Sequence, residues 1–306
     1  MTAPPEGLGE PEIWIRRSTL VVPADRGRMV EKSATIPTDV VMLDMEDAVV
    51  YTDHAKGEAR ATVLAAMRSI DFSGKEVIVR VNQVGSPWFR DDVETVVAAG
   101  PHAVVPAKIT NAQDLMLVDA ALTAAGAGPS LKIWPGIETV GAVLRCREIA
   151  AASERVELLR FGIGDYTVTM HGQFSDGNEH LLVPLTQVLS IARDAGLFAT
   201  AATVVFSDIH RLDFVRQQAV LLRRLGYDGA TVIHPSHVGE VNEVFTPTAA
   251  EIEWALHQED LLAGSAAVLV DDRLVEMVTL KLAQRTLAIA RKLGLIVGSS
   301  VRANAS

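Results

Sequence analysis

The sequence predicts an α/β protein, built as a (β/α)₈ TIM barrel with a C-terminal extension. Eight short apolar runs alternate with Ala-rich amphipathic stretches, the pattern of successive strand–helix units. The runs recur every ~30 residues over about 230 residues, which fits a closed barrel better than an open sheet. The whole chain has 306 residues, 49% of them hydrophobic and 22% charged, a balance typical of a globular protein.

The apolar runs are rich in Val, Ile and Leu, as expected of strands that are buried on both faces of a parallel sheet. They cover residues 18–24, 40–47, 76–82, 102–108, 132–138, 157–165, 199–206 and 228–235. Helices are predicted between them, for example at 54–68, 111–125, 139–152 and 184–195. The alternative is an open doubly wound sheet, but no G-x-G-x-x-G follows the first run to support a dinucleotide site.

Three segments follow from this pattern. Residues 1–12 hold three Pro and two Gly and are expected to form a flexible arm, and residues 13–245 form the barrel. Residues 246–306 form an extension, in which a helix over 245–264, a hairpin over 266–277 and a helix over 279–294 are expected. The extension is either a lid or an arm that reaches a neighbouring subunit.

Composition excludes several classes of function. Acidic residues outnumber basic ones, 38 to 28, and no Lys/Arg run exists, so no nucleic-acid partner is expected. The single cysteine, Cys146, excludes a disulfide within the chain and is interpreted as structural. No run of 18 apolar residues predicts a membrane span, and no basic segment leads an apolar one at the N-terminus, so we expect a cytoplasmic protein.

Ionisable side chains follow most of the apolar runs directly. In barrel enzymes the active site lies at the C-terminal ends of the strands, so these side chains are expected to converge on one rim, and packing alone does not explain so many of them. The candidates at strand ends are Arg26, Asp44, Glu46, Asp47, Arg80, Lys108, Glu138, Asp165 and His234.

Glu138 and Asp165 are the candidate metal ligands, because two carboxylates on adjacent strands suit Mg²⁺. The alternative is structural: Glu138 would cap the following helix and Asp165 would cap a turn.

The ordered motifs RRSTLVVPADRGRMVEKS, VVMLDMEDAVVYTDHAKGEAR, IVRVN, VVPAK, GIET, FGIGD and GYDGATVIHPSHVGEVNEVFTP make a family recognisable. From about residue 15 to 292 the chain resembles the citrate lyase beta-subunit-like, HpcH/HpaI aldolase family. This family includes malyl-CoA and citramalyl-CoA lyases. The resemblance implies a Mg-dependent TIM barrel that forms homotrimers or hexamers. It also implies cleavage of a 3-hydroxyacyl-CoA into acetyl-CoA, or a homologue, and a 2-oxo acid.

The resemblance assigns roles to the charged rim. Glu138 and Asp165 would hold Mg²⁺, and Arg80 would face the oxo acid and the developing enolate, a position that suits its fork of donors. A structural ion pair with Glu46 is the alternative for Arg80. Glu46 would hold waters beside the metal or orient Arg80, and Asp47 would cap the following turn.

The remaining candidates would contact the substrate or the phosphates of CoA, which need cationic partners. For each of the basic ones, a solvated surface charge is the alternative. They are Arg17, Arg26, Lys56, Arg60, Asp44, Asp47, Pro106, Lys108, His234 and Pro235.

Two motifs depart from the family pattern. IHPSH places His237 where Gln is more frequent. In the tail, family members carry an Asp in a segment like MIDMP that reaches the active site of the next subunit. Here the segment is LVEMV, so Glu276 takes that position and is expected to exchange a proton with the acetyl carbon.

The function expected is therefore that of a Mg-dependent carbon–carbon lyase acting on a hydroxyacyl-CoA. A Mg-dependent malyl-CoA thioesterase, a metal-dependent aldolase acting on free hydroxy-oxo acids, and a non-catalytic subunit of a lyase complex are the alternatives. Intact Glu138, Asp165 and Arg80 argue against the last of these. The residues leave open the hydroxyacyl group and whether the thiol is CoA or an acyl carrier.

Overall fold

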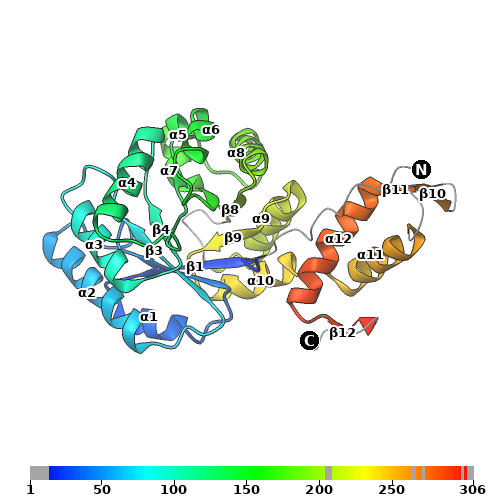
Figure 1. The fold of residues 1–306 in the computed structure, drawn as a ribbon, viewed down its shortest axis with the longest axis horizontal. Helices are drawn as coiled ribbons and strands as arrows, with labels where there is room; N and C mark the ends of the chain where they lie inside the picture. Colours follow the sequence, from blue (N-terminus) through cyan, green and yellow to red (C-terminus); the bar gives the residue numbers. More distant parts are fainter. Residues whose placement is uncertain (1–13, 204–208, 263–266, 271–272, 298–299, 302–306) are drawn as a thin grey trace. The chain divides into compact units, whose positions relative to one another are not determined.

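The computed structural model in Figure 1 describes residues 14–203, 209–262, 267–270, 273–297 and 300–301. The chain forms two compact units, of which one is Arg16–Phe245 and the other contains the residues on either side. The arm expected at residues 1–12 lies outside the described residues.

The larger unit is built on one parallel sheet in the order β5-β4-β3-β2-β1-β9-β8-β7-β6. All eight predicted apolar runs contribute to it. The strands are β1 (Ser18–Pro23), β2 (Val40–Asp44), β3 (Glu76–Val81), β4 (Ala103–Pro106), β5 (Lys132–Ile133), β6 (Gly136–Ile137), β7 (Leu158–Phe161), β8 (Phe198–Ala202) and β9 (Gly229–Val232).

The fifth predicted strand is divided into β5 and β6 by Trp134 and Pro135. Pro135 has no N–H to donate to a neighbouring strand. Hydrogen bonding nevertheless continues around the ring, because β5 pairs with β4 while Ile133 donates to the carbonyl of Arg155 at 2.9 Å, just before β7. The sheet order begins at β5 and ends at β6, and both belong to the fifth predicted strand. The sheet therefore closes on itself, and the fold is TIM-barrel-like.

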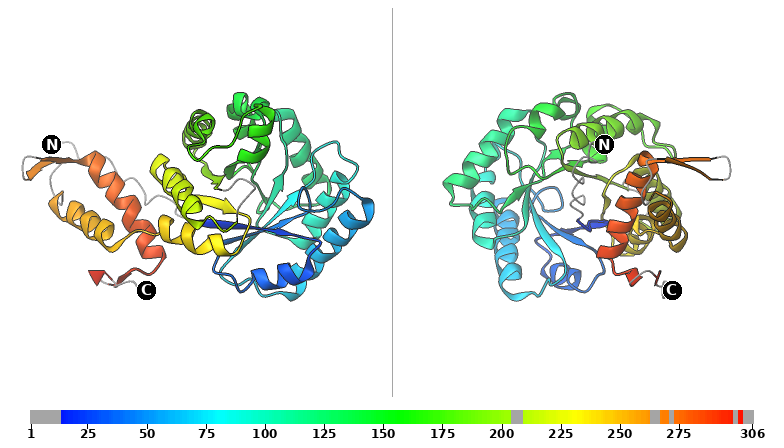
Figure 2. Two further views of the ribbon diagram at one scale, coloured as in Figure 1. Left: turned by 180° about the vertical axis from the view of Figure 1, so that it is seen from behind. Right: turned by 45° about the vertical axis from the view of Figure 1, so that its right-hand side comes forward.

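Helices surround the sheet (Figure 2). Most of the apolar core lies between the sheet and these helices, and a second apolar cluster that includes Met42, Ile78 and Trp134 fills the barrel interior. The helices are α1 (Gly27–Ser33), α2 (Asp53–Ser69), α3 (Phe89–Ala99), α4 (Ala112–Ala124), α5 (Val140–Leu144), α6 (Cys146–Ala150), α7 (Ile163–Thr169), α8 (Leu182–Asp194), α9 (Leu212–Leu225) and α10 (Ser236–Phe245).

Two sequence-based boundaries were wrong. The helix expected over 139–152 is divided at Arg145 into α5 and α6. The strand expected over 157–165 ends at Phe161, because Gly162 is the N-cap of α7, so Asp165 lies in the first turn of a helix rather than at a strand end.

A buried ion cluster closes the N-terminal end of the barrel. The guanidinium of Arg16, which has no exposed side-chain surface, donates to Glu76 at 2.6 Å and to Glu157 at 3.0 Å. It lies 4.6 Å from the ring centre of Trp134, whose indole N–H also donates to Glu157. These contacts pair the buried charges with one another at the N-terminal end of the barrel. In barrel enzymes the active site lies at the opposite end, where the strands have their C-terminal ends.

The smaller unit contains the helices and the hairpin expected beyond the barrel. Helix α11 (Ala249–Leu261) starts at a capping box formed by Thr248 and Glu251 and packs against α12 (Met277–Lys292) through small and aliphatic side chains. The hairpin pairs β10 (Ala267–Val270) with β11 (Arg273–Glu276), and β12 (Ile296–Val297) pairs with β13 (Ser300–Val301). No helix in the described part of the chain has the length and apolar character needed to cross a membrane.

Candidate active site

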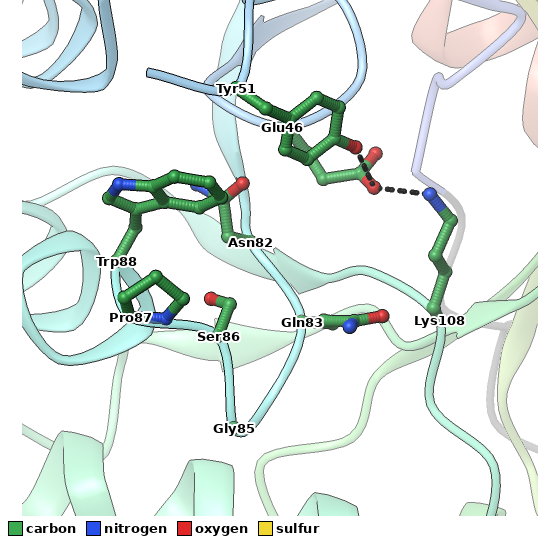
Figure 3. Close-up of a pocket in the computed structure, with 9 residues that line it drawn as sticks. All are labelled: Glu46, Tyr51, Asn82, Gln83, Gly85, Ser86, Pro87, Trp88 and Lys108. Atoms are coloured by element: carbon green, nitrogen blue, oxygen red, sulfur yellow. Dashed lines mark hydrogen bonds and ion pairs between the residues drawn. The ribbon is translucent and has the colours of Figure 1, made fainter. Parts of the chain in front are cut away.

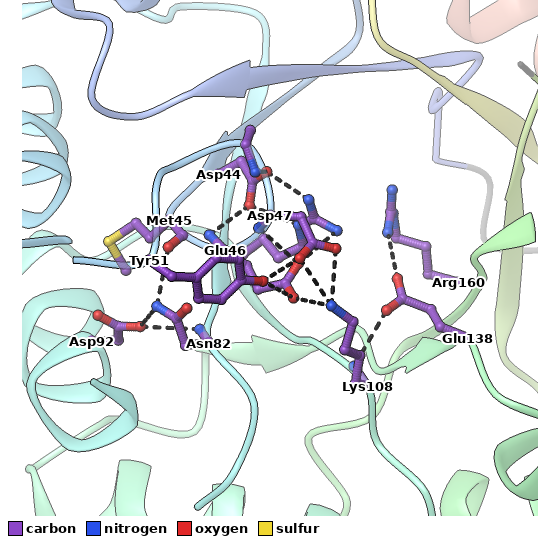
Figure 4. Close-up of polar contacts among 12 residues, drawn as sticks. Asp44, Met45, Glu46, Asp47, Tyr51, Asn82, Asp92, Lys108, Glu138 and Arg160 are labelled. Carbon is purple, nitrogen blue, oxygen red and sulfur yellow. Dashed lines mark hydrogen bonds and ion pairs between the residues drawn. The ribbon is translucent and has the colours of Figure 1, made fainter. Parts of the chain in front are cut away.

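The C-terminal ends of four neighbouring strands gather charged side chains into one cluster (Figure 4). Asp44 ends β2, Arg80 lies near the end of β3, Lys108 follows β4 and Glu138 follows β6. The loop after β2 adds Glu46 and Asp47 to this cluster.

Arg80 and Asp44 form a two-pronged ion pair across adjacent strands. Nε and Nη2 of Arg80 donate to the two carboxylate oxygens of Asp44 at 2.7 and 2.6 Å, and Nη1 lies 3.2 Å from Glu46. Burial alone would raise the pKa of Asp44, but Arg80 and the N–H groups of Glu46 and Ala48 hold that pKa below its usual value. The structural ion pair weighed for Arg80 is thus present, with Asp44 as its main partner.

Lys108 connects two parts of the cluster. Its ammonium donates to Glu46 at 2.6 Å and to Asp47 at 2.9 Å, while its backbone N–H donates to Glu138 at 3.3 Å. The residue has φ +52°, a left-handed conformation that non-glycine residues adopt mostly where the surrounding structure requires it. This backbone turn allows one residue to reach all three carboxylates.

Glu46 and Asp47 are adjacent carboxylates with opposite pKa shifts. Burial raises the pKa of Glu46 to about 7, and the nearby charges of Asp47 and Glu138 add to this effect. The pKa of Asp47 is lowered to about 2 despite partial burial, because the hydroxyl of Tyr51 and the ammonium of Lys108 donate to its carboxylate. Such a pair can combine a proton-carrying acid with a permanent negative charge.

Glu138 is 2% exposed and is held in a narrow glycine-lined space. A Cβ at Gly162 would overlap the Glu138 side chain, and one at Gly136 would lie 3.0 Å from its carboxylate carbon. Gly162 has an ordinary negative φ, so glycine is required at this position by space rather than by backbone conformation.

Asp165 is half-buried in the first turn of α7. Burial raises its pKa and the charge of Glu138 raises it further, so the two carboxylates are electrostatically coupled. In the described part of the chain the Asp165 carboxylate accepts no hydrogen bond and forms no ion pair.

A divalent cation fits these two carboxylates, because it would offset their mutual repulsion and give Asp165 a partner. No group of three or more His, Cys, Asp or Glu among the described residues forms a complete metal cage. Mg²⁺ commonly takes one or two carboxylates and fills its other positions with water or substrate oxygens.

A cavity of about 410 Å³ opens beside Glu46 and Lys108 (Figure 3). The rings of Tyr51 and Trp88, 5.7 Å apart, form its aromatic wall. The ammonium of buried Lys56 lies 4.3 Å from the Tyr51 ring centre and donates to the carbonyls of Met45 and Glu46. The other lining residues are Asn82, Gln83, Gly85, Ser86 and Pro87.

The structure brings only some of the predicted phosphate contacts to this rim. Arg26, at the rim after β1, has a side chain that is 65% exposed and lies beside Asp25. Arg60 is engaged by Asp92 at 3.0 Å. Arg17 precedes β1, at the opposite end of the barrel from the cluster, where it is paired with Asp39 at 2.8 Å.

The other substrate candidates are at strand ends. Pro106 is the buried last residue of β4. His234 follows β9, with Nδ1 2.7 Å from the hydroxyl of Ser236, and Pro235 beside it is exposed. His237 is fully buried, and its Nε2 lies 2.8 Å from the carbonyl of Ile209. Glu276 belongs to the smaller unit, where it is the exposed last residue of β11.

Sequence reasoning missed Arg160 and Tyr51. Arg160 lies on β7 with Nη1 3.7 Å from Glu138, and its signal was an arginine inside an apolar run, two residues after Leu158. Tyr51 follows the acidic motif by four residues, and nothing in its spacing distinguishes it from a surface tyrosine.

Similar proteins cover nearly the whole chain. A (3S)-malyl-CoA thioesterase of Cereibacter sphaeroides is 31% identical over 279 residues, covering 90% of this chain and 94% of that protein. The citrate lyase beta subunit of Escherichia coli is 33% identical over 245 residues, covering 78% and 80%.

Solved structures share the fold. The protein CitE of Mycobacterium tuberculosis, in complex with magnesium, acetoacetate and coenzyme A, superposes with a TM-score of 0.75 at 24% identity, covering 90% of this chain and 98% of that one. The model of the HpcH/HpaI aldolase/citrate lyase family matches residues 17–235, which include every carboxylate of the cluster. This chain therefore belongs to the HpcH/HpaI aldolase/citrate lyase family.

Proposed function

We propose that the protein is a Mg-dependent lyase that cleaves a 3-hydroxyacyl-CoA into acetyl-CoA, or a homologue, and a 2-oxo acid. The observation that carries this proposal is the coupled pair of Glu138 and Asp165 beside the fixed guanidinium of Arg80. Among the residues that the structure describes, Asp165 has no hydrogen-bond or ion-pair partner. The relatives named citrate lyase beta subunit and malyl-CoA thioesterase support a thioester substrate.

Glu138 and Asp165 would hold the Mg²⁺, which supplies a Lewis acid for the oxygen that becomes the ketone. The M. tuberculosis protein crystallised with magnesium supports this assignment. The glycines around Glu138 then have a function, because they fix the direction of the carboxylate before the cation binds.

Arg80 would stabilise the negative charge that develops on the enolate oxygen when the carbon–carbon bond breaks. Asp44 fixes two of its three nitrogens, so the guanidinium is positioned before the substrate arrives. Glu46, with a pKa near 7, lies beside the third nitrogen and can hold or release a proton at working pH.

The cavity beside Glu46 would receive the substrate, with Lys108 at its edge and Tyr51 and Trp88 as its apolar wall. Arg26 and His234, at the same rim, are the further substrate contacts proposed here. Lys56 and Arg60 would act indirectly, by holding the segments that carry this aromatic wall. Lys56 binds the loop after β2, and Arg60 binds Asp92 of α3.

A thioesterase is the second candidate, favoured by the C. sphaeroides relative. One experiment separates the two: incubation with Mg²⁺ and a panel of 3-hydroxyacyl-CoAs, with oxo acid and free thiol measured separately. Oxo acid without thiol identifies a lyase, and thiol without oxo acid identifies a thioesterase. If neither product forms, the same assay on free hydroxy-oxo acids tests the aldolase alternative.

We further propose a homotrimer or hexamer in which the smaller unit brings Glu276 to the site of a neighbouring subunit. Mixed oligomers of Glu276→Gln and Arg80→Ala chains would then regain some activity, because some sites receive intact residues from both chains. A fully active Glu276→Gln protein would remove Glu276 from the mechanism.

A further inference from the structure

Asn82 carries an unused hydrogen-bond acceptor in the wall of the cavity shown in Figure 3. The residue directly follows β3, is 1% exposed and lines the cavity. Its amide nitrogen donates to Asp92 at 2.6 Å and to the carbonyl of Met45 at 3.0 Å. Both partners accept hydrogen bonds, so these contacts fix which end of the amide is nitrogen and which is oxygen. The oxygen is buried and has no donor among the described residues.

Asp92 holds the Asn82 amide in this orientation. One oxygen of the fully buried Asp92 carboxylate accepts from both the backbone N–H and the amide nitrogen of Asn82. Its other oxygen accepts from Arg60 at 3.0 Å. A buried acceptor that is fixed in place and left without a donor requires an explanation, and a donor on a ligand in the adjoining cavity provides one.

A tight turn brings Ser86 to the wall of the same cavity. The backbone N–H of Ser86 donates to the carbonyl of Gln83 at 3.1 Å, and Gly85 supplies the positive φ, +86°, that glycine adopts readily at the third position of such a turn. The hydroxyl of Ser86 is buried and has no hydrogen-bond partner in the described part of the chain. Within five residues the cavity wall therefore carries an acceptor and a hydroxyl that the protein does not use.

Trp88 adds a flat apolar surface to this wall. Its indole N–H donates to Asp53 at 2.8 Å, so this N–H is already occupied. Its ring lies 5.7 Å from the ring of Tyr51, and the buried ammonium of Lys56 lies 5.4 Å from its centre. A flat ring, an acceptor and a hydroxyl together are complementary to a neutral planar group with one N–H and one carbonyl, which is a secondary amide.

We propose that Asn82 and Ser86 are specificity-determining residues that bind the amide nearest the sulfur in the thiol arm of the substrate. Asn82 would accept the amide N–H, and Ser86 would donate to the amide carbonyl. CoA and acyl carriers share this pantetheine arm, with its first amide two carbons from the sulfur. The site would then recognise the arm by a single N–H rather than by charge.

This inference rests on the proposed function, in which the thioester reacts beside Arg80 and the metal pair. Glu46 and Lys108 line the cavity and also belong to the charged cluster around Arg80. The part of the arm that enters the cavity is therefore the part closest to the reacting carbon, and this part contains the first amide.

Two neutral ligands test the inference without turnover. One is pantetheine, and the other is its analogue in which oxygen replaces the NH of the first amide. The analogue keeps the carbonyl and the length of the arm but offers no donor to Asn82. In calorimetric titrations of the full chain, pantetheine is expected to bind at least ~10-fold more tightly than this analogue. The analogue with the same replacement at the second amide is the control and should bind like pantetheine.

Two variants separate the contributions of the two residues. Ser86→Ala is expected to weaken both pantetheine and the first analogue by about threefold to fivefold, because both ligands keep the carbonyl. Asn82→Leu is expected to abolish the preference for the amide. It also removes the contacts to Asp92 and Met45, so circular dichroism checks its fold, whereas Ser86→Ala removes no side-chain hydrogen bond seen among the described residues. Ser69→Ala is the matched control, because this exposed serine donates within α2.

A parallel titration with CoA assigns the source of the arm, and either result is compatible only with a site for the arm. Tighter binding of CoA than of pantetheine identifies CoA, and equal binding favours an arm attached to a carrier. Equal affinity for pantetheine and the first analogue, no binding of either, or unchanged affinities in Ser86→Ala would each overturn the subsite.

The proposed function is measured separately, by the release of oxo acid from 3-hydroxyacyl-CoAs. Release of oxo acid together with equal affinities for the amide and its analogue would overturn the subsite alone. Preference for the amide without release of oxo acid would overturn the lyase and leave Asn82 and Ser86 as residues that bind the arm.

Discussion

The guanidinium of Arg80 holds the carboxylate of Asp44 through two parallel hydrogen bonds of 2.7 and 2.6 Å. The two residues are direct register partners on β3 and β2, so the sheet itself sets their separation. Asp44 is fully buried and also accepts two backbone N–H bonds from the following loop. The pair therefore fixes both the arginine and the loop that carries Glu46.

Replacing Arg80 by Lys keeps the charge but removes the planar fork. The turnover number is expected to fall by about 100-fold or more, with a smaller change in substrate binding, if Arg80 acts on the developing enolate. The free energy of unfolding is expected to fall by about 2 kcal/mol, because Asp44 loses a two-pronged partner. Steady-state kinetics and urea denaturation measure the two effects. An unchanged turnover number with only a raised Michaelis constant would limit Arg80 to substrate positioning.

Replacing one carboxylate of the Glu138–Asp165 pair by its amide tests whether the pair binds Mg²⁺. Glu138→Gln and Asp165→Asn are each expected to abolish Mg²⁺-dependent activity and to weaken Mg²⁺ binding by about 10-fold or more, with the barrel still folded. Calorimetric Mg²⁺ titration and circular dichroism are the measurements. Full activity of either variant at low Mg²⁺ would contradict the assignment.

Gly162→Ala should disturb the proposed metal site without replacing a charged residue. The added Cβ would overlap Glu138, so the carboxylate must move and Mg²⁺ affinity is expected to fall about 10-fold. Gly57→Ala is the control, since a Cβ at this position in α2 meets no atom within 4 Å. It should leave Mg²⁺ binding unchanged and stabilise the protein by about 0.5–1 kcal/mol. Equal Mg²⁺ affinity in both variants would show that the glycine-lined space is not needed.

Glu157→Gln is expected to lower the free energy of unfolding by an amount that depends on pH. Burial would raise the pKa of Glu157, but His102, Arg16 and Trp134 lower it from 4.5 to about 2. The carboxylate therefore stabilises the fold fully above pH 4.5, and this contribution is lost as the pH falls toward 2.

At pH 7 the Gln variant is expected to be about 2 kcal/mol less stable than the native protein. The difference should narrow as urea denaturation is repeated at lower pH. Glu154→Gln, on the exposed turn nearby, should show no such difference. A stability difference that does not change with pH would contradict the role assigned to the Glu157 charge.

Cys146 is expected to be unreactive in the folded protein. Its thiol is buried, and burial raises its pKa to about 12, so the thiolate fraction at pH 8 is on the order of 10⁻⁴. Iodoacetamide should label it only after urea unfolding, as mass spectrometry would show. Rapid labelling of the native chain would contradict the buried placement.

The strands were predictable because each one is a short apolar run buried on both faces. The class of fold and the family were therefore accessible from the sequence, and so was the gathering of Asp44, Arg80 and Glu138 at one end of the sheet. The break at Trp134 and Pro135 was not predicted, because apolar character continues through it.

Sequence reasoning could not predict which partners the charged side chains have in the folded protein. Lys56 and Arg60 look like exposed helical cations, but the helix directs them inward to carbonyls and to Asp92. Arg17 belongs to a family motif, yet its position before β1 places it at the far end of the barrel. Only the three-dimensional register shows that Arg160 lies beside Thr200 on the adjoining strand β8.

The buried cluster around Arg16 closes the base of the barrel, so molecules that react inside can leave only through the opposite end. A cleavage that yields two products in such a space imposes an order of departure: the fragment nearer the opening leaves first, and the deeper fragment leaves second. In the proposed lyase, the acid half would lie at Glu138 and Asp165, so the thioester fragment would depart first and the oxo acid second. If the protein is the proposed lyase, the oxo acid would then be the product that competes with incoming substrate for the free enzyme.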